Sequence, residues 1–232
     1  MLDLGCGTGA MTAWLASAYP DAEVIGVDIA PIPDRHHKPN VEYVQGNVLE
    51  LMKTDSRFQQ GSFDYIFQRF LIFGLQDWKD HFNALKALLR PGGWLESQEA
   101  SWRCRSADGS SVLNDGWQWY TAWKVDSSAR HLDVEIGDHL REILQNVSGL
   151  QNVDETVHSI HPCKQAERPE LDGIQGQIED LVLLVVEKTC STYRTNEEVE
   201  ALLAEIRSIW TAGFEPGDHY RMSCVVAQRQ AD

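Results

Sequence analysis

The chain has 232 residues, of which 43% are hydrophobic and 24% are charged, and its formal net charge is −15 at pH 7. This size and composition fit one globular domain over 1–232 better than two, and no apolar run approaches the roughly 18 residues needed to cross a bilayer. The acidic excess disfavours nucleic acid and anionic membranes as partners, because both are bound by clustered Lys and Arg.

The first hundred residues alternate short apolar runs with helical patterns, which is typical of βαβ units and a parallel sheet. Strands are predicted over residues 1–4, 23–28, 41–45, 63–68 and 93–98. Helices are predicted over Gly9–Tyr19 and Asp77–Leu89. We expect Pro91-Gly92-Gly93 to end the second helix and turn the chain into the fifth strand.

The pattern weakens after residue 100, where polar turns and the aromatic run WQWYTAW indicate an insertion over about 101–134. Residues 137–162 read as a helix, a turn and a strand, and residues 219–228 read as a final strand. Between these strands, helices are predicted over Ile174–Lys188 and Thr195–Ala212. The second of these helices begins with Thr195 and Glu198 at capping-box spacing. We therefore expect residues 101–134 and 162–215 to form a cap on the substrate side.

A glycine-rich loop, LDLGCGTG, follows the first predicted strand and opens the first helix. Glycines there let the backbone turn tightly and approach a ligand. Asp28 ends the second strand, where a carboxylate can accept hydrogen bonds from both hydroxyls of a ribose. The pattern GxGxxG/A with Ala10 is met as well, so these residues alone leave NAD and S-adenosylmethionine open.

Successive segments, LDLGCGTG, VIGVD, VQGNV, FDYIFQR and LLRPGGWLE, resemble the motifs of class I methyltransferases. More narrowly, VIGVDIAPI, KPNVEY, LQDW and PGGWLESQE resemble the LaeA-like group of fungal methyltransferases and methyltransferase regulators. The resemblance implies a Rossmann-like α/β fold with a mostly parallel seven-stranded sheet and helical cap insertions. It also implies S-adenosyl-L-methionine as cofactor and a small-molecule methyl acceptor from natural-product biosynthesis.

Carried over position by position, the resemblance assigns cofactor-binding roles to residues of the first half. The methionine half would meet Asp3, Gly5, Gly7 and Gly9, and the ribose would meet Asp28. The adenine would meet Ile29, Asn47 and Val48, and the reactive methyl would meet Gln68. The family usually has Asp where this chain has Asn47. A neutral amide is a weaker hydrogen-bond partner than a charged carboxylate.

Other side chains are candidates for the acceptor side and for catalysis. Arg69, Gln98 and Glu99 follow strands four and five, where open α/β sheets bind ligands, although Arg69 could equally pair with a surface carboxylate and Glu99 could be solvated. The rings of Trp117, Tyr120 and Trp123 could wall a flat substrate or pack in the core. A base, if the acceptor must lose a proton, is expected among His139, Glu99 and His219, which the sequence does not rank.

A metal site is not expected, because His158 and His161 would point to opposite faces of a strand and Cys163 adds no recognisable ligand cluster. His36 and His37 lie in a loop bounded by prolines and are expected to be solvated. Five scattered cysteines without a CxxC pair favour reduced thiols.

The first predicted strand begins at Met1, although helices precede this strand in the family. We therefore expect N-terminal helices to be missing, with weak cofactor binding and slow turnover unless a second copy or a protein partner covers the gap. A competing hypothesis is a noncatalytic, regulatory protein that acts through a partner. A third is an NAD-dependent oxidoreductase, which would need a hydride-transfer site such as a Tyr-x-x-x-Lys pair, and we expect none. No leader sequence is recognised, so a cytoplasmic location is expected, or a nuclear one for a regulator.

Overall fold

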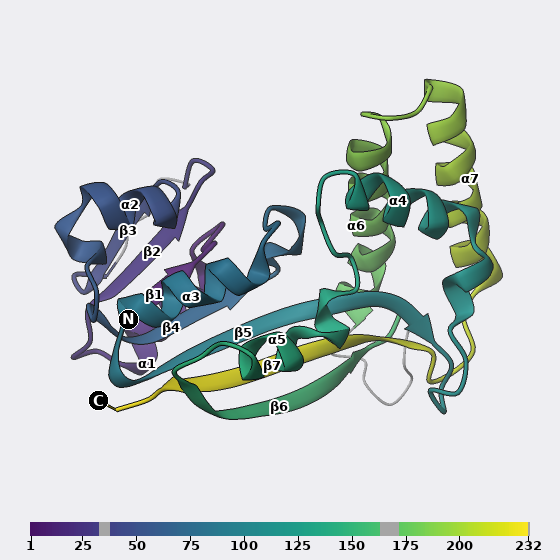
Figure 1. Cartoon of the computed structure of the whole chain (residues 1–232). Coiled ribbons are helices and arrows are strands. Elements are labelled where there is room, and N and C mark those ends of the chain that lie inside the picture. Colours follow the sequence, from purple (N-terminus) through teal and green to yellow (C-terminus); the bar gives the residue numbers. More distant parts are fainter. Residues whose placement is uncertain (33–37, 163–171, 232) are drawn as a thin grey trace.

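The chain folds around one seven-stranded sheet, as the computed structural model of residues 1–32, 38–162 and 172–231 shows (Figure 1). The strand order is β3-β2-β1-β4-β5-β7-β6. The strands are β1 (Leu2–Leu4), β2 (Val24–Asp28), β3 (Val41–Gln45), β4 (Phe63–Arg69), β5 (Leu89–Arg105), β6 (Leu150–Ile160) and β7 (His219–Arg229). Only β7 runs antiparallel to its neighbours, β5 and β6. The prediction of a mostly parallel seven-stranded α/β sheet is confirmed.

Strand β5 is longer than predicted at both ends. It begins directly after the preceding helix, so that Pro91-Gly92-Gly93 lies inside the strand, where the pairing with β4 shifts register between Phe63 and Tyr65. It continues to Arg105 beside β7. The expectation that Pro91-Gly92-Gly93 forms the turn between helix and strand is therefore wrong, because the register shift accommodates these residues at the start of the strand.

The helices mostly agree with the predicted segments. They are α1 (Ala10–Ala18), α2 (Val48–Thr54), α3 (Trp78–Leu88), α4 (Gln118–Ser128), α5 (Leu140–Gln145), α6 (Asp172–Cys190) and α7 (Asn196–Ala212). Thr195 and Glu198 form the predicted capping box, which satisfies backbone N–H groups at the start of α7, and Gly213 ends this helix with a φ of 87°. The short α2 was not predicted.

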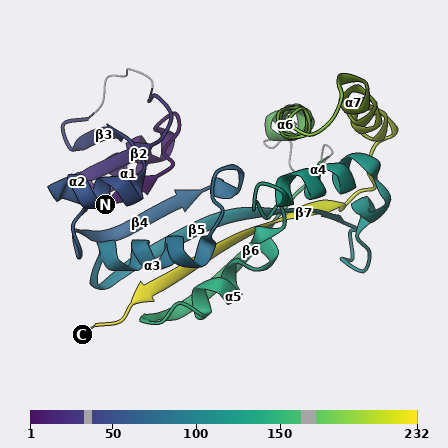
Figure 2. The same cartoon turned by 45° about the horizontal axis from the view of Figure 1, so that its top comes forward.

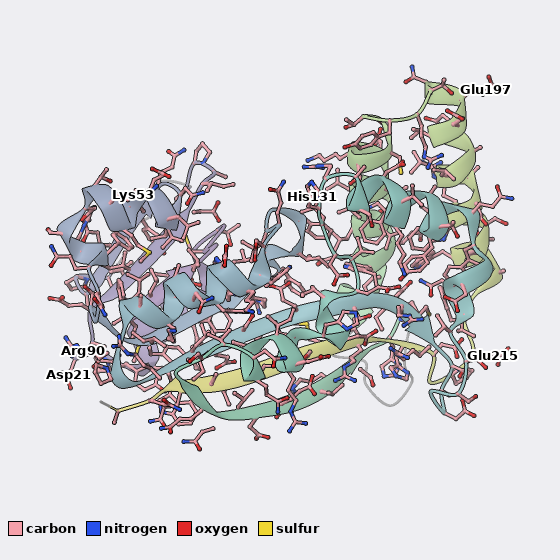
Figure 3. All side chains as sticks on the ribbon, viewed as in Figure 1. Asp21, Lys53, Arg90, His131, Glu197 and Glu215 are labelled. Atoms are coloured by element: carbon pink, nitrogen blue, oxygen red, sulfur yellow. The ribbon has the colours of Figure 1, made fainter. Side chains whose placement is uncertain are left out.

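Two regions are joined by the long strands β5 and β7 (Figures 1 and 2). One region holds β1–β4 with α1, α2 and α3. The other, which we call the helical lobe, consists of α4, α6 and α7, which contact one another. The two regions also touch between the segment before α3 and the loop after α4. There the Gln76 side chain donates a hydrogen bond to the Arg130 carbonyl at 3.1 Å. His131, labelled in Figure 3, marks this loop.

The helical lobe is packed around aromatic rings. Trp119 and Trp123 are fully buried, with their ring centroids 6.2 Å apart, and Trp102 of β5 meets Trp123 edge-on at 5.8 Å. Such pairs add specific ring contacts to the large apolar area that they bury. No helix in the described part of the chain is long and apolar enough to span a membrane.

Candidate functional site

The glycine loop turns between β1 and α1 with left-handed backbone at Gly5, Gly7 and Gly9. The three glycines have different surroundings. A Cβ at Gly9 would lie 2.4 Å from the Tyr43 hydroxyl, and one at Gly5 would lie 2.3 Å from the Leu71 side chain, whereas one at Gly7 would meet nothing within 4 Å. Gly5 and Gly9 are thus required by packing as well as by backbone conformation, and Gly7 presents open backbone.

Asp28 links the glycine loop to the end of β2. Its Oδ2 accepts a hydrogen bond from the Gly7 N–H at 2.8 Å, and its Oδ1 accepts from the Ala30 N–H at 2.8 Å. Each carboxylate oxygen retains acceptor capacity for a further donor, such as a hydroxyl. The same side chain therefore shapes the loop and can bind a ligand beside it.

A cavity of about 290 Å³ lies at the carboxyl ends of β1, β2, β3 and β4, and we call it the glycine-loop cavity. Its lining residues are Leu4, Gly5, Val27, Asp28, Ile29, Gly46, Asn47, Val48, Leu49, Arg69, Phe70, Leu71, Gly74, Leu75 and His81. Ligands of open α/β sheets bind in this position, outside the carboxyl ends of the strands. Of the predicted cofactor residues, the structure brings Gly5, Asp28, Ile29, Asn47 and Val48 to the cavity wall.

Asn47 also has a structural role, which the sequence did not predict. It is the N-cap of α2, and its Oδ1 accepts from the Leu49 N–H at 2.9 Å. Leu49 also lines the cavity, as does Ile29, which is 69% exposed. These apolar side chains flank a space in which a flat heterocycle can be held between hydrophobic surfaces.

Two predicted cofactor residues lie beneath the cavity wall rather than in it. Asp3 is buried, and its Oδ2 accepts from the Thr12 hydroxyl at 2.5 Å; burial raises the pKa of this carboxyl. Gln68 is also fully buried, and its amide nitrogen donates to the Ser97 hydroxyl at 2.9 Å. Asp3 thus joins β1 to α1, and Gln68 joins β4 to β5.

His81 of α3 completes the Gln68 network and was not among the predicted residues. Its Nε2 lies 2.7 Å from the Gln68 amide oxygen, which can only accept, so Nε2 carries the proton. Burial lowers the pKa of His81 to about 4, and the ring is neutral at pH 7. The sequence offered no signal for this role, because His81 lies between Trp78 and Phe82 on the apolar face of a predicted helix.

Glu99 lies behind the turn that follows β4. This carboxyl is fully buried; its Oε1 accepts from the Leu71 N–H at 2.8 Å, and its Oε2 has no hydrogen-bond partner among the described residues. Burial raises the pKa of Glu99 to about 8, so the carboxyl is largely protonated at neutral pH. The alternative that Glu99 is solvated is therefore wrong.

The other candidates for the acceptor side are spread out. Arg69 lines the glycine-loop cavity, with its guanidinium 5.8 Å from the centroid of the Phe70 ring, and it makes no ion pair with any described carboxylate. Gln98 donates to Glu96 at 2.6 Å. Tyr120 and Trp123 are buried in the helical lobe, and Trp117 packs at its edge, 6.2 Å from Phe214. These three rings do not line the glycine-loop cavity.

Of the three candidate bases, only Glu99 adjoins the cavity. His139 is exposed at the start of α5, and His219 is held at the start of β7, where its Nδ1 lies 2.9 Å from the Gly217 carbonyl. Within residues 1–32, 38–162 and 172–231, no three His, Cys, Asp or Glu side chains gather in a way that could hold a metal ion. His36, His37 and Cys163 lie outside the described residues.

The expectation that the chain has no Tyr-x-x-x-Lys pair is wrong, because Tyr120 and Lys124 have this spacing. Both side chains donate to Glu135 Oε1 at 2.7 Å in the helical lobe. Neither lines the glycine-loop cavity. Lys124 therefore neutralises a buried carboxylate to which Tyr120 also donates, and the pair provides no hydride-transfer site beside the glycine loop.

Comparisons with known proteins agree with this geometry. The model of the methyltransferase domain family matches residues 1–155. Methyltransferase str2 of Strobilurus tenacellus is 38% identical over 102 residues, which are 44% of this chain and 36% of that protein. The secondary metabolism regulator laeA of Aspergillus flavus is 30% identical over 157 residues, which are 66% of this chain and 41% of that protein. The matches thus span less than half the length of these relatives.

Among solved structures, phosphoethanolamine N-methyltransferase 2 of Haemonchus contortus, in complex with phosphomonomethylethanolamine and S-adenosylhomocysteine, has a TM-score of 0.54 at 18% identity. The superposition covers 99% of this chain and 49% of that one. At this identity the likeness concerns the fold, which is the one that the sequence predicted. Together, the strand order, the glycine loop and the match over 1–155 identify the chain as a member of the methyltransferase domain family, the S-adenosylmethionine-dependent class.

Proposed function

We propose that the chain binds S-adenosyl-L-methionine in the glycine-loop cavity and transfers its methyl group to a small molecule of secondary metabolism. The observation that carries this proposal is the meeting of Gly5, Asp28 and Asn47, from the carboxyl ends of β1, β2 and β3, on the wall of one cavity. The open backbone at Gly7 fits a ligand that approaches closely, and Asp28 retains acceptor capacity for ribose hydroxyls.

The residues divide the binding task by chemistry. Asp28 supplies a carboxylate for the ribose, and Ile29, Val48 and Leu49 supply apolar surface for the adenine. Gly5 and Gly7 supply backbone for the methionine half, while Asp3 and Gln68 are held in the fold by Thr12 and Ser97. When bound, S-adenosylmethionine supplies a methyl group on a sulfonium, which passes in line to the acceptor while the bonding electron pair returns to sulfur.

The chain contributes mainly position to such a transfer. Fixing two reactants in a near-attack pose can lower a barrier by roughly 7–11 kcal/mol without a dedicated catalytic side chain. Glu99, protonated at neutral pH, supports the turn beside the cavity through the Leu71 N–H. It would accept a proton from an acceptor only after losing its own.

The names of the relatives support a role in secondary metabolism. They also support a second candidate function, that of a regulator. One relative is named a methyltransferase and the other a regulator of secondary metabolism. A regulator with this fold could bind the cofactor and act through a protein partner, with no small-molecule acceptor.

Calorimetric titration with S-adenosylmethionine and S-adenosylhomocysteine tests the cofactor site. We expect saturable binding that Asp28→Ala weakens by about 10-fold or more, since hydrogen bonds to a charged group contribute roughly 1.5–3 kcal/mol. Asp21→Ala, which removes an exposed carboxylate in the same half of the molecule, is the matched control and should bind as the unchanged chain does. Equal binding by both variants would place the ligand elsewhere.

A labelled-methyl assay then separates the two functions. Transfer of label from S-adenosylmethionine to a small molecule in an extract, abolished by Asp28→Ala, supports the enzyme. Cofactor binding without transfer to any small molecule supports the regulator.

A further inference from the structure

A second cavity, of about 220 Å³, lies where α6 meets the sheet, and we call it the apolar cavity. It lies between the helical lobe and strands β5, β6 and β7, and none of the predicted cofactor-binding residues lines it. Its lining residues are Phe70, Ala100, Trp102, Ile160, Gln177, Ile178, Leu181 and Tyr220. The family motifs in the first hundred residues assign no role to this cavity.

The side chains that line the apolar cavity disfavour a charged ligand. Among the residues that the structure describes, the cavity is lined by no charged side chain and by a single amide, Gln177, with apolar and aromatic neighbours. An ion placed there would lose its hydration without gaining a partner, which is strongly unfavourable. The Trp102 and Tyr220 rings, with centroids 5.6 Å apart, instead offer faces and edges to a flat ring.

Phe70 connects the apolar cavity with the glycine-loop cavity, because it lines both. It has a left-handed backbone (φ 56°), which is unfavourable for a residue with a Cβ and persists when the surroundings enforce it. Hydrogen bonds on both sides do so here: the Phe70 N–H donates to the Gln98 carbonyl at 3.1 Å, and the Leu71 N–H donates to Glu99 at 2.8 Å. The backbone of Phe70 is thereby held at the boundary between the two cavities.

We propose that the apolar cavity binds the methyl acceptor, and that this acceptor is a small, uncharged, largely apolar molecule with a flat ring. The proposal rests on the proposed function, because it takes the glycine-loop cavity as the cofactor site. A volume of about 220 Å³ is below the roughly 300–1,000 Å³ of pockets for drug-sized ligands, which favours an acceptor of one or two rings. The shared Phe70 wall is where an acceptor and a cofactor would come closest.

Helix α6 provides a matched pair of positions for testing the cavity. Leu181 lines the apolar cavity and is 39% exposed, whereas Leu184 is 46% exposed and lies outside both cavities. Because both side chains reach solvent, an aspartate at either position can be hydrated when the cavity is empty. Only Leu181→Asp would place a carboxylate against an apolar ligand.

The experiment uses 2-naphthol as an uncharged flat probe, with 2-naphthoate and 2-naphthylmethylammonium as charged probes of the same ring system. Ligand-observed NMR titrations are made on the full chain saturated with S-adenosylhomocysteine. We expect saturable binding of 2-naphthol, with both charged probes weaker by about 10-fold or more. Leu181→Asp should weaken 2-naphthol by about 10-fold, and Leu184→Asp by less than about 2-fold.

Calorimetry with S-adenosylhomocysteine on each variant separates the two proposals. If the chain binds S-adenosylhomocysteine but not 2-naphthol, or binds a charged probe as tightly, the acceptor proposal is overturned and the proposed function stands. Equal effects of the two aspartates also overturn it. Failure to bind S-adenosylhomocysteine would instead overturn the proposed function. Should Leu181→Asp fail to fold, Leu181→Ala, which removes apolar contact without adding charge, is expected to weaken 2-naphthol by a few-fold.

Discussion

The two cavities of this protein are built in different ways. The glycine-loop cavity is formed mainly by short loops at the ends of neighbouring strands, and its wall combines backbone groups with polar side chains such as Asp28, Asn47 and Arg69. The apolar cavity is formed by side chains from β5, β6, β7 and α6, together with Phe70. A cavity made from loop backbone depends on local conformation, whereas one made from distant side chains depends on packing. Changes to the two regions should therefore have separable effects.

The largest expected effect is on the stability of the helical lobe. Trp119→Ala removes a fully buried ring and should lower the free energy of unfolding by about 3–5 kcal/mol. Trp94→Ala, at a tryptophan that is 38% exposed on β5, is the control and should cost distinctly less. Denaturant titration measures both changes. Under native conditions, affinity for S-adenosylhomocysteine should change little in either variant, and a large loss in Trp119→Ala would mean that the regions are not separable.

A change in the glycine loop should affect stability and binding together. Gly9→Ala forces a left-handed alanine whose Cβ would collide with Tyr43, so we expect a loss of about 2–4 kcal/mol. Gly61→Ala has the same φ of 75° but meets nothing within 4 Å, so backbone strain alone should cost about 1–2 kcal/mol. Affinity for S-adenosylhomocysteine should fall only in Gly9→Ala. Equal losses in both would remove the role given to Tyr43.

A change at Glu99 has the smallest expected effect near pH 5, and the effect should grow as the pH rises. Because the pKa of Glu99 is about 8 in the folded chain and lower when unfolded, the folded state holds this proton more tightly. Its contribution to stability therefore falls as pH rises from about 4.5 to about 8 and is constant above that. Glu99→Gln keeps an acceptor for the Leu71 N–H and removes this pH dependence. Its free energy of unfolding, relative to that of the unchanged chain, should therefore rise by at most about 1.4 kcal/mol per pH unit.

Unfolding measured from pH 5 to pH 9 checks this prediction. Glu197→Gln, at an exposed carboxylate on α7, is the control and should leave the pH profile unchanged. Parallel curves for Glu99→Gln and the unchanged chain would show that this carboxyl is not held protonated by burial.

Much of the first half could be predicted from its sequence. The strands, α1, α3 and the glycine loop are marked by local patterns, and the predicted residues Gly5, Asp28, Ile29, Asn47 and Val48 do lie together at one cavity. The short α2 and the bulged start of β5 were missed, because one weak turn of helix and a register shift leave little periodic signal. Leu71 and His81 were missed as well, since each lies in an apolar pattern that core packing explains equally well.

By itself, the sequence determined the order of the strands and of most helices, the glycine-loop turn and the capping box that begins α7. These features depend on neighbours a few residues away, through turn geometry and local hydrogen bonds. Only the tertiary structure decided that Tyr120 and Trp123 are buried, that Glu99 is protonated at neutral pH and that Phe70 lines two cavities. Burial and shared walls are created by residues far apart in the chain, so no local pattern contains them.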